Sequence, residues 1–173
     1  MKAGKSLLSF GVVVLTIGAM TISARGEAKP GDKPVQLELY VMSHCPFGTQ
    51  AENAIFPAIK SLGKAAELKL HFIAKDVALP APAVGSPVPA STTSSASFSS
   101  MHGPEEVLED MRHLCAMRQY PKQYMDFILE RNTNIKNPDW QSAAKKVGID
   151  PAKIEACVSS EEGARLMSDS IKA

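Results

Sequence analysis

Apolar and polar side chains alternate along residues 35–42, and a second alternating stretch covers residues 68–74. Alternation with a period of two, in segments rich in branched and aliphatic side chains, is typical of β-strands. Between these stretches, apolar residues over 51–62 recur at helical spacing, and Gly63 follows as a helix stop. The sequence therefore predicts a βαβ unit, and we expect its two strands to be parallel.

Beyond residue 100 the apolar spacing is helical, and no further segment predicts a strand. Prolines and capping residues predict five helix starts. They lie at Pro104, Pro121, Asn137-Pro138, Asp150-Pro151 and a capping box over residues 159–162. The expected fold class is therefore α/β, with a βαβ unit, a helical insertion and an incomplete sheet. Parallel sheets normally contain several strands and are covered on both faces, so two strands alone are unusual.

The first 24 residues have the order of a secretory signal peptide, with a basic start, an apolar centre and small residues before a charged run. An uncleaved membrane anchor is the alternative, because the apolar run approaches the length that spans a bilayer. Cleavage near Ala24 removes Lys2 and Lys5, which changes the formal charge from +1 to −1. A nearly neutral chain offers no basic surface to nucleic acid. We expect an exported protein, periplasmic or secreted.

The remaining chain is long enough for one domain. After a linker over residues 25–33, the βαβ unit takes residues 34–76 and the helical part takes residues 98–173. Residues 77–97 between them are rich in proline, serine and alanine and lack any apolar period, which predicts a flexible surface loop.

The three cysteines, Cys45, Cys115 and Cys157, all follow the predicted cleavage site. Cysteines tend to pair in an oxidising compartment, so an odd number leaves one over. Cys45 lies between the first strand and its helix, where helix amides and the helix dipole favour the thiolate that attacks disulfides. It is the candidate catalytic residue. The residues of its turn are His44, Pro46, Phe47 and Gly48.

The strand, the cysteine turn, the helix and the second strand resemble the thioredoxin-like fold. More specifically, Ser100-Met101-His102-Gly103 is similar to the Cys-Gln-His-Gly signature of the gamma-interferon-inducible lysosomal thiol reductase (GILT) family, which overlaps the DsbA-like bacterial oxidoreductases. In this resemblance His102 and Gly103 are signature residues, although His102 is nearly as well explained as a surface histidine. Cys115 and Cys157 lie where the family has two helical cysteines. The resemblance implies that they form a disulfide and leave Cys45 free.

Two departures from the family pattern affect the expected chemistry. The family's active site is Cys-x-x-Cys, whereas Gly48 occupies the resolving position here. Relatives also continue into a proline-preceded strand, a hairpin partner and a final helix, so the chain resembles a C-terminally truncated member. We expect a thiol-disulfide oxidoreductase-like protein that needs no cofactor. Cys45 would form mixed disulfides with protein or small thiol substrates, and an outside thiol would resolve them. A Gly48→Cys replacement would restore resolution within the turn.

Two other functions compete with this one. A redox-silent binding or chaperone-like module would keep the fold and use its groove. A Cu(I) site is the less favoured alternative, since Met42, His44 and Cys45 offer thioether, imidazole and thiolate ligands. Several acidic residues follow the signature, and we interpret them as a helix-start charge preference. They are Glu105, Glu106, Glu109 and Asp110.

Overall fold

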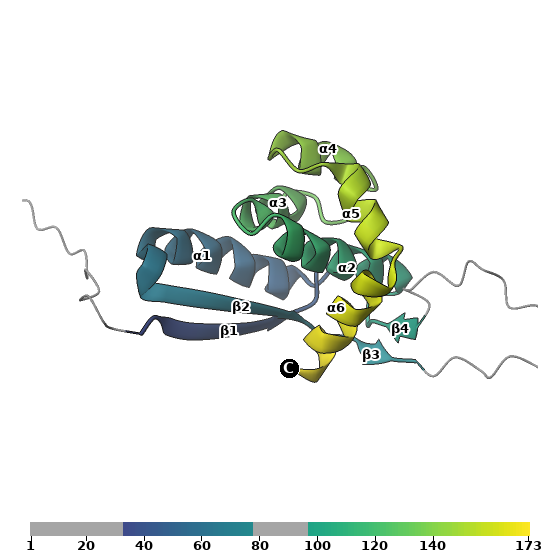
Figure 1. Ribbon diagram of the computed structural model, residues 1–173, viewed down its shortest axis with the longest axis horizontal. Coiled ribbons are helices and arrows are strands. Elements are labelled where there is room, and N and C mark those ends of the chain that lie inside the picture. Colours follow the sequence, from purple (N-terminus) through teal and green to yellow (C-terminus); the bar gives the residue numbers. More distant parts are fainter. Residues whose placement is uncertain (1–32, 78–96) are drawn as a thin grey trace, which may run out of the picture.

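The computed structural model describes residues 33–77 and 97–173. Strand β1 (Val35–Val41) runs into helix α1 (Pro46–Leu62), and a 3-10 turn, η1 (Gly63–Ala65), leads into strand β2 (Ala66–Phe72). The two strands are parallel and in register from Val35 opposite Ala66 to Val41 opposite Phe72, as predicted (Figure 1). The predicted signal peptide, the predicted linker except for Lys33, and the predicted loop except for its two end residues lie outside the described residues.

The two faces of this sheet differ in polarity because side chains alternate along each strand. Leu70, Phe72 and Val41 face the core and are buried. On the opposite face Tyr40 stacks on His71 with ring centroids 4.8 Å apart, and Lys69 Nζ lies 3.4 Å from Glu38 Oε1. The period-two pattern therefore identified the buried face correctly.

A second strand pair follows that the sequence pattern did not predict. Strand β3 (Lys75–Asp76) pairs antiparallel with strand β4 (Phe98–Ser99). Phe98 is buried in the core, so the chain that we expected to be entirely helical from residue 98 begins instead with a short strand. Two residues are too few to show an alternating pattern. Residues 100–103 follow β4 directly and lie near the end of β1. We call these residues the signature loop.

The rest of the chain is helical, as predicted (Figure 1). The helices are α2 (Pro104–Gln119), α3 (Tyr124–Asn132), α4 (Trp140–Lys146), α5 (Pro151–Val158) and α6 (Glu161–Lys172). Helix α3 begins three residues later than predicted, because residues 121–123 form a turn. The caps of α4 and α6 are Asp139 and Ser160, whose side chains accept hydrogen bonds from Ser142 N–H and Glu162 N–H.

Helix α2 lies at the centre of the core and contacts α3, α5 and α6. Its buried apolar side chains include Val107, Met111 and Leu114, which pack in one cluster with Phe127 of α3 and Met167 of α6. Helix α6 also covers β2, where Ser170 Oγ accepts a hydrogen bond of 2.7 Å from Phe72 N–H. A hydroxyl group thus satisfies a backbone donor that another strand would otherwise take.

The start of β1 is the least covered part of this sheet. Val35 is 72% exposed and Leu37 is also exposed, whereas Val41 at the other end of the strand is buried. Part of the apolar face of this sheet is therefore uncovered. Within residues 33–77 and 97–173, no helix has the length and apolarity needed to cross a membrane.

A disulfide joins Cys115 of α2 to Cys157 of α5, with Cα atoms 6.0 Å apart, and Cys45 is the free cysteine. Replacing both Cys115 and Cys157 by alanine should lower the free energy of unfolding by about 2–4 kcal/mol, because the link closes a long loop in the unfolded chain. Denaturant unfolding measures this change. Cys45→Ser is the control and should change stability by less than about 0.5 kcal/mol. Non-reducing peptide mapping that joined Cys45 to either partner would contradict the assignment.

Candidate functional site

Cys45 is the N-cap residue of α1, and Pro46 follows as its first helical residue. The turn is closed by the Cys45 N–H, which donates to Met42 O at 3.0 Å, and by the Thr49 N–H, which donates to Cys45 O at 3.0 Å. The thiol is half-buried. The first N–H groups of a helix have no partner within it, so they point toward the capping residue. This is the environment that the sequence predicted for Cys45.

Gly48 allows the first turn of α1 to approach the end of β1 closely. A Cβ atom at this position would lie 2.9 Å from Met42 O and 3.3 Å from the Val41 Cβ. The first contact is with backbone, which cannot rotate away as a flexible side chain can. A Gly48→Cys replacement therefore requires a shift of the end of β1 or of the first turn of α1. That it restores resolution within the turn stays a prediction.

An apolar groove of about 240 Å³ opens beside Cys45, along the end of β1. Leu39, Tyr40 and Met42 form its strand side, and Phe47, which is 80% exposed, lies at its helix side. Ile73 also lines the groove and is exposed. Large apolar side chains that gather at one exposed place on a protein surface mark a binding site.

The buried carboxylate of Glu106, on α2, holds the cysteine turn against the signature loop. Glu106 Oε1 accepts a hydrogen bond of 2.8 Å from His44 N–H. Glu106 Oε2 accepts hydrogen bonds from Ser100 Oγ and from His102 N–H, and the His102 imidazole Nδ1 lies 2.9 Å from Oε1. Ser43 Oγ donates to the Glu106 carbonyl at 3.4 Å. We call these residues (Ser43, His44, Ser100, His102 and Glu106) the Glu106 cluster.

The signature loop depends on both of the residues that the resemblance singled out. Gly103 is the N-cap residue of α2 and has a φ of +95°, a conformation that residues with a Cβ rarely adopt. His102 binds Glu106, so the structure gives it the loop-ordering contact and not the isolated surface position. His102 and the cysteine turn are linked through this one carboxylate.

The charge of Glu106 is set by its hydrogen bonds. Burial alone would raise the pKa of Glu106, but the hydrogen bonds from Ser100, His44 and His102 outweigh burial, and its pKa is lowered. Hydrogen bonds to the charged form of a carboxyl group favour that form. Glu106 is therefore an ionised acceptor, which strengthens its contact with the backbone of the turn.

Asp110, one helical turn further on, has the opposite charge state. Its Oδ1 accepts from Ser43 N–H at 3.1 Å, but its Oδ2 is buried without a hydrogen-bond partner. Burial raises the pKa of Asp110 well above its usual value, and the nearby carboxylates Glu106 and Glu109 raise it further, although the Ser43 hydrogen bonds oppose the shift. Asp110 is thus held as a neutral acid beneath the cysteine turn.

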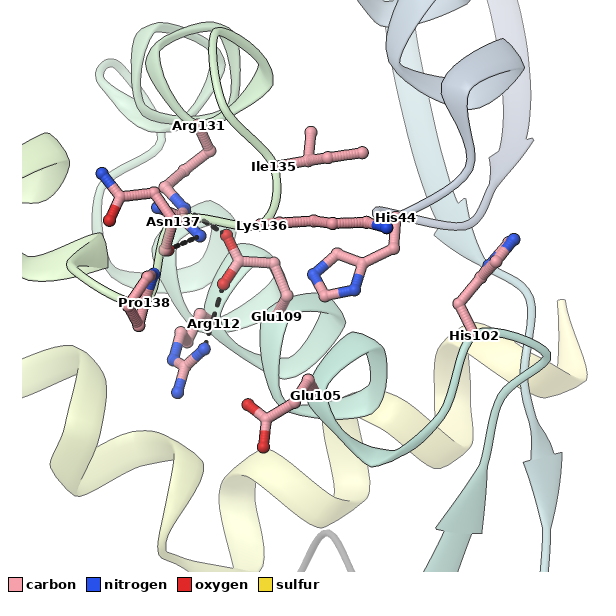
Figure 2. A pocket seen from close by; sticks show the side chains of 10 residues that line it. All are labelled: His44, His102, Glu105, Glu109, Arg112, Arg131, Ile135, Lys136, Asn137 and Pro138. Carbon is pink, nitrogen blue, oxygen red and sulfur yellow. Dashed lines mark hydrogen bonds and ion pairs between the residues drawn. The ribbon is translucent and has the colours of Figure 1, made fainter.

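A polar cavity of about 460 Å³ borders the cysteine turn at His44 (Figure 2). In its wall, Glu109 binds Arg131 of α3 and also Arg112, whose Nη1 lies 3.0 Å away. Burial raises the pKa of Glu109, but His113 and Arg131 outweigh burial and hold it far below its usual value. Burial lowers the pKa of His44, which favours its neutral imidazole at neutral pH.

The interpretation of the acidic residues after the signature was right for the helix start but incomplete. Glu105 and Glu106 lie in the first turn of α2, as that interpretation requires. However, Glu106, Glu109 and Asp110 are buried, and they contact the cysteine turn or form the cavity wall. Their spacing along the helix is the sequence signal that could have identified them. Residues 106 and 110 lie one turn apart and alternate with the buried Val107 and Met111, so they share the core-facing side of α2.

The predicted metal ligands do not converge on one space. Met42 and Cys45 line the apolar groove, whereas His44 lines the polar cavity. In the part of the chain that the structure describes, no group of three or more His, Cys, Asp or Glu side chains is arranged to hold a metal ion.

The sequence profile of the family "Gamma interferon inducible lysosomal thiol reductase (GILT)" matches residues 36–147, roughly two thirds of the chain. The chain belongs to the GILT family. The matched range contains the cysteine turn, the signature loop and Cys115 of the disulfide. A comparison with curated proteins gave no significant match. The resemblance drawn from the sequence is confirmed, and this GILT-family chain carries Gly48 where the family pattern has a second cysteine.

The Glu106 cluster gives a stability prediction with a matched control. Glu106→Gln keeps the shape of the side chain but loses the charge and turns an NH2 group toward the donors of the cluster. We expect the free energy of unfolding to fall by about 1–3 kcal/mol. Glu105→Gln, at the exposed neighbouring position, should change it by less than about 0.5 kcal/mol. Equal effects of the two variants in denaturant unfolding would contradict this role of Glu106.

Asp110 gives a prediction about pH. The folded protein keeps a proton on Asp110 that the unfolded chain releases above about pH 4. This raised pKa makes wild-type stability fall as pH rises from about 4 toward the folded-state pKa. Asp110→Asn retains the acceptor for Ser43 N–H and does not titrate. Its stability relative to wild type should therefore increase between about pH 5 and pH 8, by at most about 1.4 kcal/mol per unit.

Denaturant unfolding at each pH measures this difference, and subtracting wild type removes the titration of His44, Glu52 and the other groups common to both proteins. The exposed Asp76 provides the control, since Asp76→Asn should follow the wild-type pH dependence. A constant difference between Asp110→Asn and wild type would show that Asp110 is ionised in the folded protein.

Proposed function

We propose that the protein is a thiol-disulfide oxidoreductase that acts through Cys45 alone. The observation that carries the proposal is the position of this cysteine. It is the free cysteine, half-buried at the start of α1 and beside an apolar groove, while Cys115 and Cys157 are joined to each other. Membership of a family named for thiol reductase activity supports the same reaction class.

The proposed reaction is one round of thiol-disulfide exchange. The Cys45 thiolate attacks one sulfur of a substrate disulfide, a Cys45–substrate disulfide forms, and the second substrate sulfur leaves as a thiolate that takes a proton from water. In this proposal Cys45 reacts as its thiolate, which is the form of a cysteine that attacks disulfides. Release then requires an outside thiol, because Gly48 supplies no sulfur in the turn.

The groove supports protein substrates with apolar residues near their disulfide. Phe47, Tyr40 and Ile73 are exposed large apolar side chains around Cys45, and water is displaced from them when an apolar segment binds. The expected partners are disulfide-bearing or thiol-bearing proteins, and small thiols for the resolving step. A redox-silent binding module remains the second candidate, favoured by the same groove and by the close contact at Gly48 that excludes a second cysteine without movement of β1.

We also propose that the protein is exported, to the periplasm or beyond the cell. The pattern of residues 1–24 supports this, with a basic start, an apolar centre and small residues at its end. The disulfide between Cys115 and Cys157 supports it as well, because such links persist mainly in oxidising compartments.

The test of this function is the chemistry of Cys45. Wild-type protein mixed with 4,4′-dithiodipyridine should form one pyridyl mixed disulfide and release one equivalent of thiopyridone, and it should accelerate insulin reduction by a small thiol. Cys45→Ser and Cys45→Ala should do neither, while their circular dichroism spectra stay unchanged. Insulin reduction that survives both replacements would refute the mechanism. Mixed-disulfide formation without any acceleration of insulin reduction would favour the binding module.

A further inference from the structure

The polar cavity at His44 has walls that carry more positive than negative charge (Figure 2). Arg112, Arg131 and Lys136 contribute three cations, and Glu105 and Glu109 contribute two carboxylates. Glu109 is already bound by both arginines, so its charge is neutralised within the wall. One cation is therefore in excess, before any charge on the two histidines is counted.

Lys136 is the cation of this wall to which no described carboxylate is bound. No hydrogen bond or ion pair joins its amine to another group among residues 33–77 and 97–173. In Figure 2 its side chain extends across the cavity toward His44. The arginines, in contrast, are fixed in place, since Arg131 Nη2 donates to Asn137 O at 2.9 Å and Arg112 stacks over the Trp140 ring at 5.0 Å. A free ammonium beside a fixed pair of guanidinium groups is suited to bind a carboxylate.

His44 joins this cavity to the reacting sulfur. Its side chain lines the cavity, and the next residue in the chain is Cys45, which lines the apolar groove. Consecutive Cα atoms are about 3.8 Å apart, so the cavity and the groove border adjacent residues of the cysteine turn. A neutral imidazole can also accept the proton of an approaching thiol.

We propose that this cavity binds a small thiol that carries a carboxylate, and that this thiol resolves the mixed disulfide at Cys45. The proposal rests on the proposed function, because it names the co-substrate of the same site. Lys136 holds the carboxylate, while the substrate protein occupies the groove on the Cys45 side of the turn.

The chemistry needs two molecules of this thiol. The first gives its proton to His44 or water, and its thiolate attacks the Cys45–substrate disulfide. A disulfide forms between Cys45 and the small thiol, and the substrate sulfur leaves as a thiolate. The second thiolate attacks the small-thiol sulfur of this new disulfide. The oxidised small thiol leaves as a symmetric disulfide, and Cys45 is again a thiolate, so the two electrons gained by the substrate come from the two small thiols.

The test compares three thiols of similar size and different charge. The pyridyl mixed disulfide at Cys45 is prepared first, and the release of thiopyridone is timed with 3-mercaptopropionate, 2-mercaptoethanol and cysteamine. Each rate is divided by the rate of the same thiol with a small pyridyl disulfide, which corrects for thiolate fraction and nucleophilicity. For wild type, we expect the anionic thiol to react about two- to fivefold faster than the neutral one at low salt. The advantage should shrink as ionic strength rises. Propionate, which has no thiol, should slow the anionic thiol and leave cysteamine unaffected.

Lys136→Gln should remove the advantage of 3-mercaptopropionate and leave the rate for mercaptoethanol within about 1.5-fold of wild type. The rate for cysteamine should stay equal or rise, because the lost charge repels a cationic thiol. Lys153 is an exposed lysine on α5 that does not line the cavity. Lys153→Gln makes the same change in net charge and should leave all three rates unchanged. Equal corrected rates for the anionic and neutral thiols in wild type would overturn the proposal. An identical effect of Lys136→Gln on all three thiols would also overturn it.

Two further outcomes are distinguishable. If no pyridyl mixed disulfide forms at Cys45, or if no thiol releases it, the proposed function itself is refuted. Equal rates with the three thiols, in contrast, refute only the charge preference. Two short cysteine peptides, one with aspartate and one with asparagine beside the cysteine, test whether the cavity binds a small thiol or an acidic protein segment. A dependence on Lys136 that appears only with the aspartate peptide would refute the small-thiol assignment.

Discussion

Glu106 brings an ionised carboxylate from the first turn of α2 against the backbone of the cysteine turn. His44 N–H is one of its donors, and Ser100 and His102 of the signature loop supply the others. These segments lie more than fifty residues apart in the sequence, and the Glu106 contacts hold them together at the site. The direction in which His44 and Cys45 point therefore depends on a charge that belongs to a different element.

Three carboxyl groups within two turns of one helix cannot all be ionised in a buried site, because like charges repel strongly where water is excluded. The structure resolves this by giving each one a different set of partners. Glu109 has two arginines, Glu106 has hydrogen-bond donors from two loops, and Asp110 has a single backbone donor and keeps its proton. The proton lies on the group with the fewest partners. As a result, the cysteine turn contacts a neutral carboxyl group at Asp110. The negative charges lie on Glu106, at the signature loop, and on Glu109, in the wall of the polar cavity.

Local periodicity was sufficient to predict most of the fold. The parallel pair β1 and β2, the helix between them and the succession of later helices all follow from apolar spacing and from caps such as Asp150 and Gly63. The short strands β3 and β4 were missed because two residues show no period, and they exist only because distant segments meet. Cys45 was found because its chemistry is local to the start of a helix. Glu106 and Asp110 were not, since a buried carboxylate on a helix is recognisable only when the donors that satisfy it are known.

The close approach at Gly48 has a consequence for how the site must work. The end of β1 and the first turn of α1 touch so tightly that a Cβ on residue 48 would meet Met42 O, so a sulfur within this turn requires the strand to move. Gly48 itself supplies no sulfur, so in the proposed mechanism the attacking thiol comes from solvent. Among the described residues, the apolar groove and the polar cavity both border the cysteine turn. A bound protein substrate would fill the groove, because its apolar walls suit a polypeptide and its volume is small. The polar cavity is lined by other residues than the groove. In the proposed mechanism it therefore gives an outside thiol a separate approach to the cysteine turn, and Lys136 beside that approach favours an anionic thiol over a cationic one.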